Sequence, residues 1–392
     1  MSSYLTAAVA AQRLGVTRAT LYAYVSRGQI RSRSVAGRRE REYLAEDVER
    51  LVKRASGRRD PARVASQALG MDGLPVLTSG LSLIESGRLY YRGKDALELA
   101  ANERFEAVAG LLWGGACELE GLLHVPNAKE RAQLAQLHFA RAGQRYLVAA
   151  EALDPAAYLA SPEAVRRSGA RILCGLTLVA TRQGPAPGSV ASALCRAWGL
   201  SERAALRALE EALILCADHE LNVSAFTARA IASAGATPYM AVSGALAALT
   251  GHRHGGMTAR VAALLDEEGD PTRLLVERLR LGESVPGFGH ALYPDGDPRA
   301  LRLLELCPKN AAQARCMAFA RAGERVLGER PVLDFGLVAL ARSLGLPASA
   351  PFVLFALGRT AGWIAHCLEQ YALGQLIRPR AEYTGPRPEQ DR

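Results

Sequence analysis

Aromatic residues and closely spaced cysteines are scarce in this sequence. Aromatic residues make up 6% of the 392 residues, and the seven cysteines are scattered, odd in number and free of any CxxC motif. They stand at positions 117, 174, 195, 216, 307, 316 and 367. This usage is typical of reduced core thiols rather than of a disulfide framework or a zinc site, and we therefore expect a cytoplasmic protein.

Long apolar runs are also missing. The N-terminal stretch MSSYLTAAVAAQRLGV has no extended apolar segment and is interrupted by Arg13, so it does not indicate a signal peptide. The most apolar stretch covers residues 352–373, where an arginine, a histidine and a glutamate interrupt it. We expect a buried helix there rather than a membrane span, and no membrane partner.

Basic charge is concentrated at one end of the chain. The net charge of +9 comes from 48 Lys and Arg against 39 Asp and Glu, and only four of the basic residues are lysines. Residues 1–59 hold thirteen basic against five acidic residues, whereas the rest of the chain holds 35 against 34. The basicity therefore belongs to a small N-terminal module. Ala and Leu dominate the chain, which predicts a mostly helical soluble protein with more than one core.

Residues 4–55 have the pattern of a small winged helix-turn-helix. Thr6 and Thr17 are candidate N-caps of two helices joined by the turn LGV. A basic, strand-like stretch with a glycine turn follows over residues 30–43, and a third helix is expected near 45–54. Helix, turn, helix and then a ribbon is the layout of a winged helix-turn-helix unit.

This module resembles the DNA-binding part of the MerR/excisionase type in LTAAVAAQRLGVTRATLYAYVSRGQI and in GRREREYLAEDV. The resemblance assigns residues 1–56 to that domain. It implies that the second helix offers Arg18 and Tyr22 to a major groove, while Arg38 and Arg39 of the wing contact phosphates. A single such module binds DNA weakly and needs a dimer for useful affinity. A role in assembly or tethering therefore stays open beside nucleic-acid binding.

Residues 57–75 are rich in Gly and Pro and predict a linker. A short β-hairpin follows in LSLIESGRLYYRG, with Ser86 and Gly87 as its turn residues. From Asp95 onward the pattern is one helix after another, separated by Gly and Pro.

Four short segments concentrate His, Asp and Arg among small residues. They are DHELN at 218–222, GHRHGG at 251–256, PGFGH at 286–290 with DPR at 297–299, and PVLD at 331–334, which FALGRTAGW and LIRPRAEY follow. In isolation His219 is typical of a core or capping histidine, and Asp334 of a helix N-cap. His252 and His254 lack a spaced third His or Cys ligand, so we expect no metal site.

Arg359 is harder to explain as a structural residue. It lies in the middle of an apolar helical stretch. A guanidinium group is costly to bury without an anion, so we expect a carboxylate partner for it.

Together these segments resemble the citrate synthase family. The resemblance is carried by CADHELNVSAFTARAIASAGATPYMAVSGALAALTGHRHGGM, PGFGHALYPDGDPRA, FALGRTAGWIAHCLEQ, LIRPRAEYTGP and ESGRLYYRG, and covers roughly residues 75–392. It implies an all-α fold behind the N-terminal module. The large helical domain comprises residues 76–255 and 346–392, and a small domain, 256–345, is inserted in it.

The resemblance implies that acetyl-CoA and oxaloacetate condense to citrate and CoA, and leaves 2-methylcitrate synthesis from propionyl-CoA open. Asp334 matches the base, His254 the group that hydrogen-bonds the enolate oxygen, and His290 the group that polarises the 2-oxo acid carbonyl. The substrate carboxylates would be held by His219, Arg299, Arg359 and Arg378. Acetyl-CoA is a substrate here, and no cofactor or metal is implied.

In the family the arginine that matches Arg378 comes from a neighbouring subunit, so the resemblance implies a homodimer or a larger assembly. Four departures bear on substrate choice, CoA affinity and rate. PVLD replaces the usual PNVD, Gly336-Leu337-Val338 replaces the usual Tyr-Ser-Gly, His252-Arg253 replaces the common Pro-Leu, and no Lys or Arg lies between His290 and Arg299. A DNA-binding regulator that uses the fold as a metabolite sensor is the alternative from another class. The basic module favours it, and the intact His, Asp and Arg set disfavours it.

Overall fold

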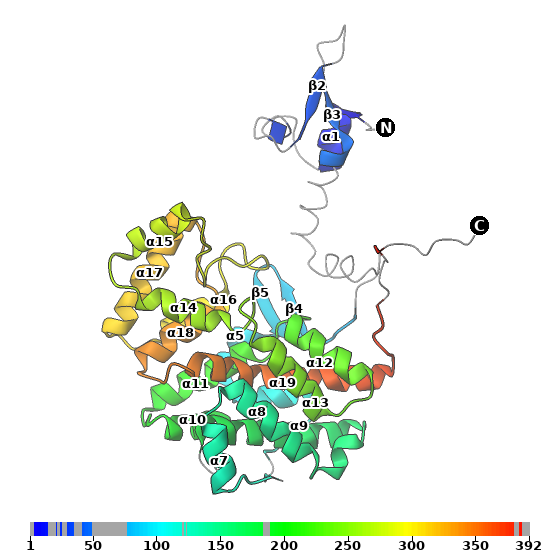
Figure 1. Ribbon diagram of the computed structural model, residues 1–392, viewed down its shortest axis with the longest axis vertical. Coiled ribbons are helices and arrows are strands. Elements are labelled where there is room, and N and C mark those ends of the chain that lie inside the picture. Colours follow the sequence, from blue (N-terminus) through cyan, green and yellow to red (C-terminus); the bar gives the residue numbers. More distant parts are fainter. Residues whose placement is uncertain are drawn as a thin grey trace, which may run out of the picture. The chain divides into compact units, whose positions relative to one another are not determined.

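The computed structural model describes residues 4–14, 21, 24–25, 30–34, 41–48, 77–119, 121–122, 124–182, 189–379 and 384–385. The chain divides into two compact units. Residues 1–78 and 378–392 form the first unit, and residues 79–377 form the second (Figure 1).

The first unit contains a small antiparallel sheet and a short helix. The strands are β1 (Tyr4–Thr6), β2 (Ser32–Ser34) and β3 (Arg41–Leu44), in the order β1-β3-β2. Helix α1 (Ala7–Leu14) follows β1, and Thr6 Oγ1 accepts a hydrogen bond from the backbone N–H of Val9 at 3.5 Å. The small core consists of Ala10, Ala11, Leu21, Ile30, Tyr43 and Val48.

The winged helix-turn-helix assignment stays a prediction, although some of its individual elements are present. The first predicted helix is present as α1, and the predicted strand-like stretch 30–43 contains β2 and most of β3, which ends at Leu44; β1 was not predicted. Residues 45–48 are helical, as expected for the start of the third helix. Most of the second predicted helix, the wing tip and the linker lie outside the described residues, and so do the four candidate DNA contacts Arg18, Tyr22, Arg38 and Arg39.

The second unit begins with a β-meander made of β4 (Ser82–Glu85), β5 (Arg88–Tyr91) and β6 (Lys94–Asp95). Ser86 and Gly87 connect β4 to β5 with φ angles of 51° and 74°, as a tight primed hairpin turn requires. The predicted hairpin is therefore confirmed. With two small sheets, the fold is mostly helical rather than all-α.

Helices form nearly all of the remaining second unit. They are α5 (Ala96–Asn102), α6 (Phe105–Trp113), α7 (Ala128–Ala135), α8 (Phe139–Glu151), the 3₁₀ turn η1 (Pro155–Tyr158), α9 (Pro162–Thr181), α10 (Val190–Ala197), α11 (Arg203–Cys216), α12 (Val223–Ser233), α13 (Pro238–Leu249), α14 (Met257–Asp266), α15 (Pro271–Arg280), α16 (Pro298–Glu305), α17 (Ala311–Leu327), α18 (Leu333–Ser343) and α19 (Ala350–Leu373). Many begin at Asn, Asp, Ser or Thr, whose side chain accepts a first-turn N–H group.

Helix α19 forms the centre of the second unit. It packs against α6, α9, α11, α12 and α13, among which it runs in Figure 1. By length and composition it could cross a membrane, but 94% of its most apolar window is buried inside the protein. The prediction of a buried helix over residues 352–373 is therefore confirmed.

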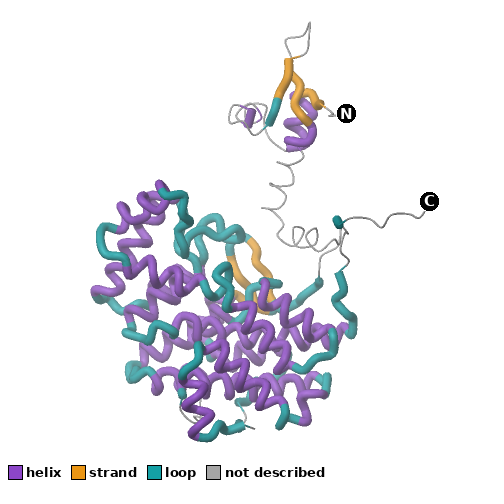
Figure 2. The backbone as a smooth tube through the Cα atoms, in the orientation of Figure 1, coloured by secondary structure: helices purple, strands orange, loops and turns teal. Residues whose placement is uncertain are grey.

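Helices α14 to α18 pack mainly on one another. Helix α16 lies on α18, α15 lies on α17, and both α14 and α17 contact α18. Figure 2 shows these helices grouped on one side of the second unit, and the strands β4 and β5 near them. The group corresponds to the predicted small domain, residues 256–345. Because residues 79–377 form one compact unit, the division into a large and a small domain stays a prediction.

All seven cysteines lie in the described part of the chain, and Cys117, Cys195, Cys216, Cys307, Cys316 and Cys367 are free thiols there. Five of them are buried, and Cys117 and Cys174 are half-buried. The five buried cysteines agree with the prediction of core thiols.

Candidate active site

The four sequence segments meet at a pocket with a volume of about 490 Å³. Six of the predicted site residues line it: His219, His254, His290, Arg299, Asp334 and Arg359. They come from the loops before α12 and α14, from the loop before α16, and from α16, α18 and α19. The tertiary fold therefore brings together residues that are up to 140 positions apart in the sequence.

Other lining residues were not predicted from the sequence. They include Asn222, Arg253, Met257, Arg260, Ser284, Phe288, Asp297 and Phe355. Asn222 and Asp297 were inside the quoted motifs, and both are N-caps that accept first-turn N–H groups. The apolar members gave no signal in the sequence, because Met and Phe are also ordinary core residues.

The loop that carries His290 is joined to the segment before α18 by backbone pairing. Val332 N–H donates to Gly287 O at 3.0 Å, and Gly289 N–H donates to Arg330 O at 3.1 Å. Gly289 has a φ of +74°, and a Cβ atom there would meet the Glu329 carboxylate at 2.5 Å. The left-handed backbone favours glycine here, and a larger residue would also have to push the Glu329 side chain aside. The pairing positions His290 beside the start of the helix that carries Asp334.

Arg299 and Asp297 form a buried, bidentate ion pair. Asp297 Oδ1 accepts from Arg299 Nε–H at 2.9 Å, and Oδ2 accepts from an Arg299 terminal N–H at 2.8 Å. Oδ2 also accepts the backbone N–H of Leu333 at 3.0 Å, which ties α16 to α18. Although burial alone would raise the pKa of Asp297, the charge of Arg299 holds it below its usual value.

His290 is held as a neutral ring with a defined tautomer. Burial, followed by the charge of Arg299, lowers its pKa to about 4, so the ring is uncharged at pH 7. The backbone N–H of Leu292 donates to His290 Nδ1 at 3.2 Å. Because Nδ1 accepts, the ring proton resides on Nε2. His290 therefore has an N–H group available to a carbonyl oxygen.

His219 packs edge-on against His290, with ring centroids 5.3 Å apart. Its Nε2 atom lies 3.0 Å from the hydroxyl oxygen of Tyr293, a residue that the sequence did not single out. The Arg299 guanidinium lies 5.3 Å from the centre of the Tyr293 ring. Burial, with a smaller contribution from Arg299, lowers the pKa of His219 well below its usual value. Both histidine rings on this side of the pocket are therefore uncharged, and the charges there are those of the Arg299–Asp297 ion pair.

His254 is oriented by a serine. Its Nε2 atom lies 2.8 Å from Ser224 Oγ, which accepts the indole N–H of Trp363 at 3.1 Å. The His254 ring packs edge-on against Phe355, with centroids 5.7 Å apart. Burial, followed by the charge of Arg359, lowers the pKa of His254 to about 4. The ring is therefore neutral at pH 7, and Nδ1 is the nitrogen that Ser224 leaves available.

Asp334 lies inside the first turn of α18, whose N-cap is Val332. It therefore does not cap the helix, contrary to what its position suggests in isolation. Its side chain is half-buried, and its Oδ1 atom is shielded from water, with no hydrogen-bond partner among the described residues. Burial raises the pKa of Asp334 to about 7. A carboxylate of this kind can exchange a proton near neutral pH.

Arg359 is 1% exposed and donates its Nε–H to the backbone oxygen of Cys216 at 2.7 Å. Within the described residues it forms no ion pair, so the expected protein carboxylate partner is not found. Burial lowers its pKa, and Asp218 opposes this shift from a longer range. The carboxylate of Asp218 is bound to Ser82 and His366 instead, at 2.6 and 3.1 Å. Arg359 is thus a buried cation at a pocket wall.

Arg378, the remaining predicted substrate-binding residue, is not placed at this pocket. Arg378 is exposed and belongs to the first unit, so its role stays a prediction. Among the residues that the structure describes, no group of three His, Cys, Asp or Glu side chains is arranged to hold a metal ion.

Comparison with known proteins places the chain in a family. Residues 70–380 match the model of the citrate synthase C-terminal domain. The chain is 31% identical to citrate synthase 2 of Bacillus subtilis over 363 residues, which cover 81% of this chain and 95% of the relative. It is 34% identical to citrate synthase of Haloferax volcanii over 364 residues, with coverages of 81% and 95%.

The fold agrees with these relatives. Citrate synthase from Thermotoga maritima superimposes with a TM-score of 0.66 at 25% identity, covering 82% of this chain and 97% of that structure. The family match begins at residue 70, so the basic N-terminal module lies outside it. From the site geometry, the sequence relatives and the fold together, we conclude that the chain belongs to the citrate synthase family and is an acyltransferase of that type.

Proposed function

We propose that this acyltransferase condenses acetyl-CoA with oxaloacetate and releases citrate and CoA. The observation that carries the proposal is the composition of the pocket. It combines one carboxylate of raised pKa, three neutral histidines and two buried arginines, one of which has no ion pair within the described residues. Proton abstraction next to a thioester needs such a base together with a hydrogen-bond donor, and a dicarboxylate substrate needs the cations.

The arginines and two histidines are suited to oxaloacetate. Arg359 would receive one carboxylate of the dianion, which would supply the anion that this buried guanidinium lacks. Arg299, which Asp297 keeps charged, would face the second carboxylate of oxaloacetate. His290 would donate its Nε2–H to the 2-oxo carbonyl oxygen, which makes the carbonyl carbon more electrophilic. His219 would hold the substrate beside it.

Asp334 would remove a proton from the methyl group of the acetyl thioester. The electron pair of the C–H bond then moves toward the thioester oxygen, where His254 would donate a hydrogen bond from Nδ1. This requires that Ser224 donates its hydroxyl proton to His254 Nε2. Trp363 N–H donates to the same hydroxyl oxygen, and the hydroxyl proton has two acceptors within reach, Asn222 Oδ1 and His254 Nε2, each at 2.8 Å; the proposed step uses the second.

The enolate carbon would next attack the carbonyl carbon of oxaloacetate. A C–C bond forms, and the carbonyl oxygen takes up a proton supplied through His290. Water then cleaves the thioester, which yields citrate and free CoA. Asp334, His254 and His290 act in one sequence here, so the loss of any of them should reduce turnover.

Domain closure would complete the site. His290, Arg299 and Asp334 belong to the proposed small domain, 256–345, whereas His219 and Arg359 belong to the proposed large domain. Closing the two would exclude water from the thioester until the new bond has formed. The arginine at 378 would reach the site of a neighbouring subunit in a homodimer.

The decisive assay measures thiol release from acetyl-CoA and from propionyl-CoA, each with and without oxaloacetate. Thiol release from acetyl-CoA that depends on oxaloacetate, with citrate as the product, would support the proposal. A higher kcat/KM with propionyl-CoA would instead indicate a 2-methylcitrate synthase. If neither thioester releases thiol in response to oxaloacetate, the proposal is wrong.

A second function, DNA binding, is proposed for the N-terminal module. It is supported by the excess of basic residues within 1–59 and by the separate small core of the first unit. Two of its arginines are already engaged, because Arg31 pairs with Asp47 at 2.9 Å and Arg33 with Glu42 at 2.8 Å. Phosphate contacts would therefore fall to other basic side chains, such as those of the predicted wing.

A further inference from the structure

Two arginines of the pocket lie on its solvent side. Arg253 is exposed and Arg260 is half-buried, and both line the same pocket as the proposed catalytic groups. Arg260 donates to Ser284 Oγ at 2.9 Å, and another of its terminal nitrogens lies 3.9 Å from Met257 Sδ. Within the described residues neither arginine forms an ion pair. Two cations are thus left without an anionic partner at the mouth of the site.

The charged residues deeper in the pocket do not neutralise Arg253 and Arg260. Arg299 is matched by Asp297 through two hydrogen bonds. Arg359 is 1% exposed and faces the proposed dicarboxylate position. The stretch between His290 and Arg299, ALYPDGDP, contributes two aspartates and no base. The unmatched positive charge at the mouth is therefore supplied by the segment 251–260.

We propose that Arg253 and Arg260 bind the phosphate groups of the acyl-CoA substrate, and this inference rests on the proposed function. The reacting thioester must lie at His254, which is less exposed than its neighbour Arg253. The rest of the substrate then leaves the pocket past the exposed arginines. A phosphomonoester carries a charge of about −1.5 to −2 at pH 7, and the guanidinium fork pairs with phosphate oxygens in a bidentate manner.

The test compares thioesters that share the acetylpantetheine part and differ in the phosphate-bearing nucleotide part. Wild type, Arg253→Gln, Arg260→Gln and the double variant are assayed with acetyl-CoA, acetyl-dephospho-CoA and S-acetylpantetheine. The quantity is the ratio of kcat/KM for acetyl-CoA to kcat/KM for S-acetylpantetheine, which lacks the pyrophosphate and the 3′-phosphate. One charged hydrogen bond corresponds to about a tenfold change, so each single variant should lower the ratio about tenfold.

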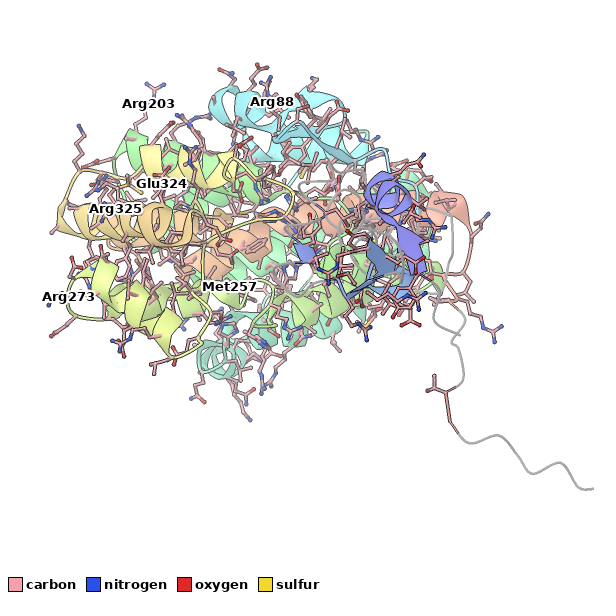
Figure 3. All side chains as sticks on the ribbon, turned by 90° about the horizontal axis from the view of Figure 1, so that it is seen from above. Arg88, Arg203, Met257, Arg273, Glu324 and Arg325 are labelled. Atoms are coloured by element: carbon pink, nitrogen blue, oxygen red, sulfur yellow. The ribbon has the colours of Figure 1, made fainter. Side chains whose placement is uncertain are left out.

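Two further variants control for indirect effects. Arg273→Gln removes an exposed arginine of α15 that is not part of the pocket lining; Figure 3 shows it projecting from the periphery, whereas Met257 lies well inside the outline. This variant should leave the ratio as in wild type. Arg253→Lys keeps the charge and should recover part of the loss. Raising the salt concentration should increase the KM for acetyl-CoA more in wild type than in the double variant, because salt screens exposed charges.

The outcomes separate the inference from the proposed function. If wild type does not condense acetyl-CoA with oxaloacetate at all, the function itself fails. If wild type is active and the ratio is the same in the double variant, the assignment of these arginines is wrong. A loss that disappears with acetyl-dephospho-CoA places them at the 3′-phosphate, and a loss that persists with it but not with S-acetylpantetheine places them at the pyrophosphate.

Discussion

Asp334 combines a shielded Oδ1 atom, a place in the first turn of α18 and a pKa raised by burial to about 7. As the proposed base for the acyl methyl group, it has no substitute among the other lining side chains, since the remaining carboxylate, Asp297, is bound to Arg299. We expect Asp334→Asn to lower kcat by orders of magnitude while oxaloacetate still binds. Steady-state kinetics and calorimetric titration with oxaloacetate measure the two quantities. Near-normal turnover would remove Asp334 from the mechanism.

The pKa of Asp334 also predicts how stability depends on pH. Its value in the folded protein, about 7, lies above the ordinary 3.8, so between these values the folded state binds more protons than the unfolded state. Asp334 therefore destabilises the fold increasingly as pH rises from about 4 to 7. Asp334→Asn should raise Tm by a few degrees at pH 8 and have little effect near pH 4. Thermal unfolding at both pH values tests this, and an equal change at both would contradict it.

His254 and His290 act in the opposite direction, because burial lowers the pKa of each to about 4. Between that value and the ordinary 6.5 the unfolded state binds more protons, so the free-energy cost of burying these rings falls as pH rises and is absent near pH 7. The same burial keeps both rings neutral at the pH where Asp334 begins to ionise. Activity should therefore fall as pH drops below about 7, through protonation of Asp334 rather than of the histidines.

At the level of secondary-structure elements, an ion pair links α16 to α11. Arg302 Nε–H donates to Glu211 Oε2 at 2.7 Å, and a terminal N–H of Arg302 donates to Oε1 at 3.1 Å. The Glu211 side chain is 2% exposed, whereas that of Arg302 is 31% exposed. Helix α16 also carries Arg299, so this contact fixes the helix that presents a proposed substrate ligand.

Arg302→Gln should lower the free energy of unfolding by about 2 kcal/mol, because Glu211 would stay buried while retaining only its longer contact with Arg207. It should also raise the KM for oxaloacetate. Glu305→Gln is the matched control. Glu305 is the other partner of Arg302, and its side chain is 66% exposed. Its replacement should change the free energy of unfolding by less than about 0.5 kcal/mol. Chemical denaturation of both variants measures this. Equal losses of unfolding free energy in the two variants would show that the buried Arg302–Glu211 pair contributes no more to stability than the exposed Arg302–Glu305 pair.

At the scale of the whole molecule, the basic module and the helical unit should be separable. A chain that starts near Leu74 should keep synthase activity, because the family match begins at residue 70 and the pocket lies in residues 79–377. The full-length protein should bind DNA with an affinity that falls steeply with salt, since each neutralised phosphate releases counterions. Fluorescence anisotropy at several salt concentrations measures this. Without DNA binding even at low salt, an assembly role would be favoured.

Arg378 predicts a site shared between subunits. If a neighbouring chain supplies it, Arg378→Ala and Asp334→Asn should each be nearly inactive alone. A mixed dimer then regains one site, with Asp334 from one chain and Arg378 from the other. Random mixing should restore about a quarter of wild-type activity, since half of the dimers are mixed and each has one of its two sites intact. Mixed subunits that remain inactive would contradict the shared site.

Much of the site could be predicted from the sequence, because its chemistry depends on residue types that are costly in other contexts. Arg359 within an apolar helix and the glycines around Phe288 are examples, and both segments line the pocket. The hairpin at Ser86 and Gly87 was predictable for the same reason, since a tight turn needs positive φ angles. These requirements concern single residues and their neighbours in the chain, so they can be recognised in the amino-acid sequence.

Only the tertiary structure decided which groups set the hydrogen bonding and protonation of the site residues. Ser224 at His254, Tyr293 at His219 and the absence of a described ion-pair partner for Arg359 depend on how distant helices pack. The raised pKa of Asp334 has the same origin, because it results from burial by several elements at once. Burial and contact arise from many residues together, so the sequence determined the reacting groups, and packing determined their protonation and partners.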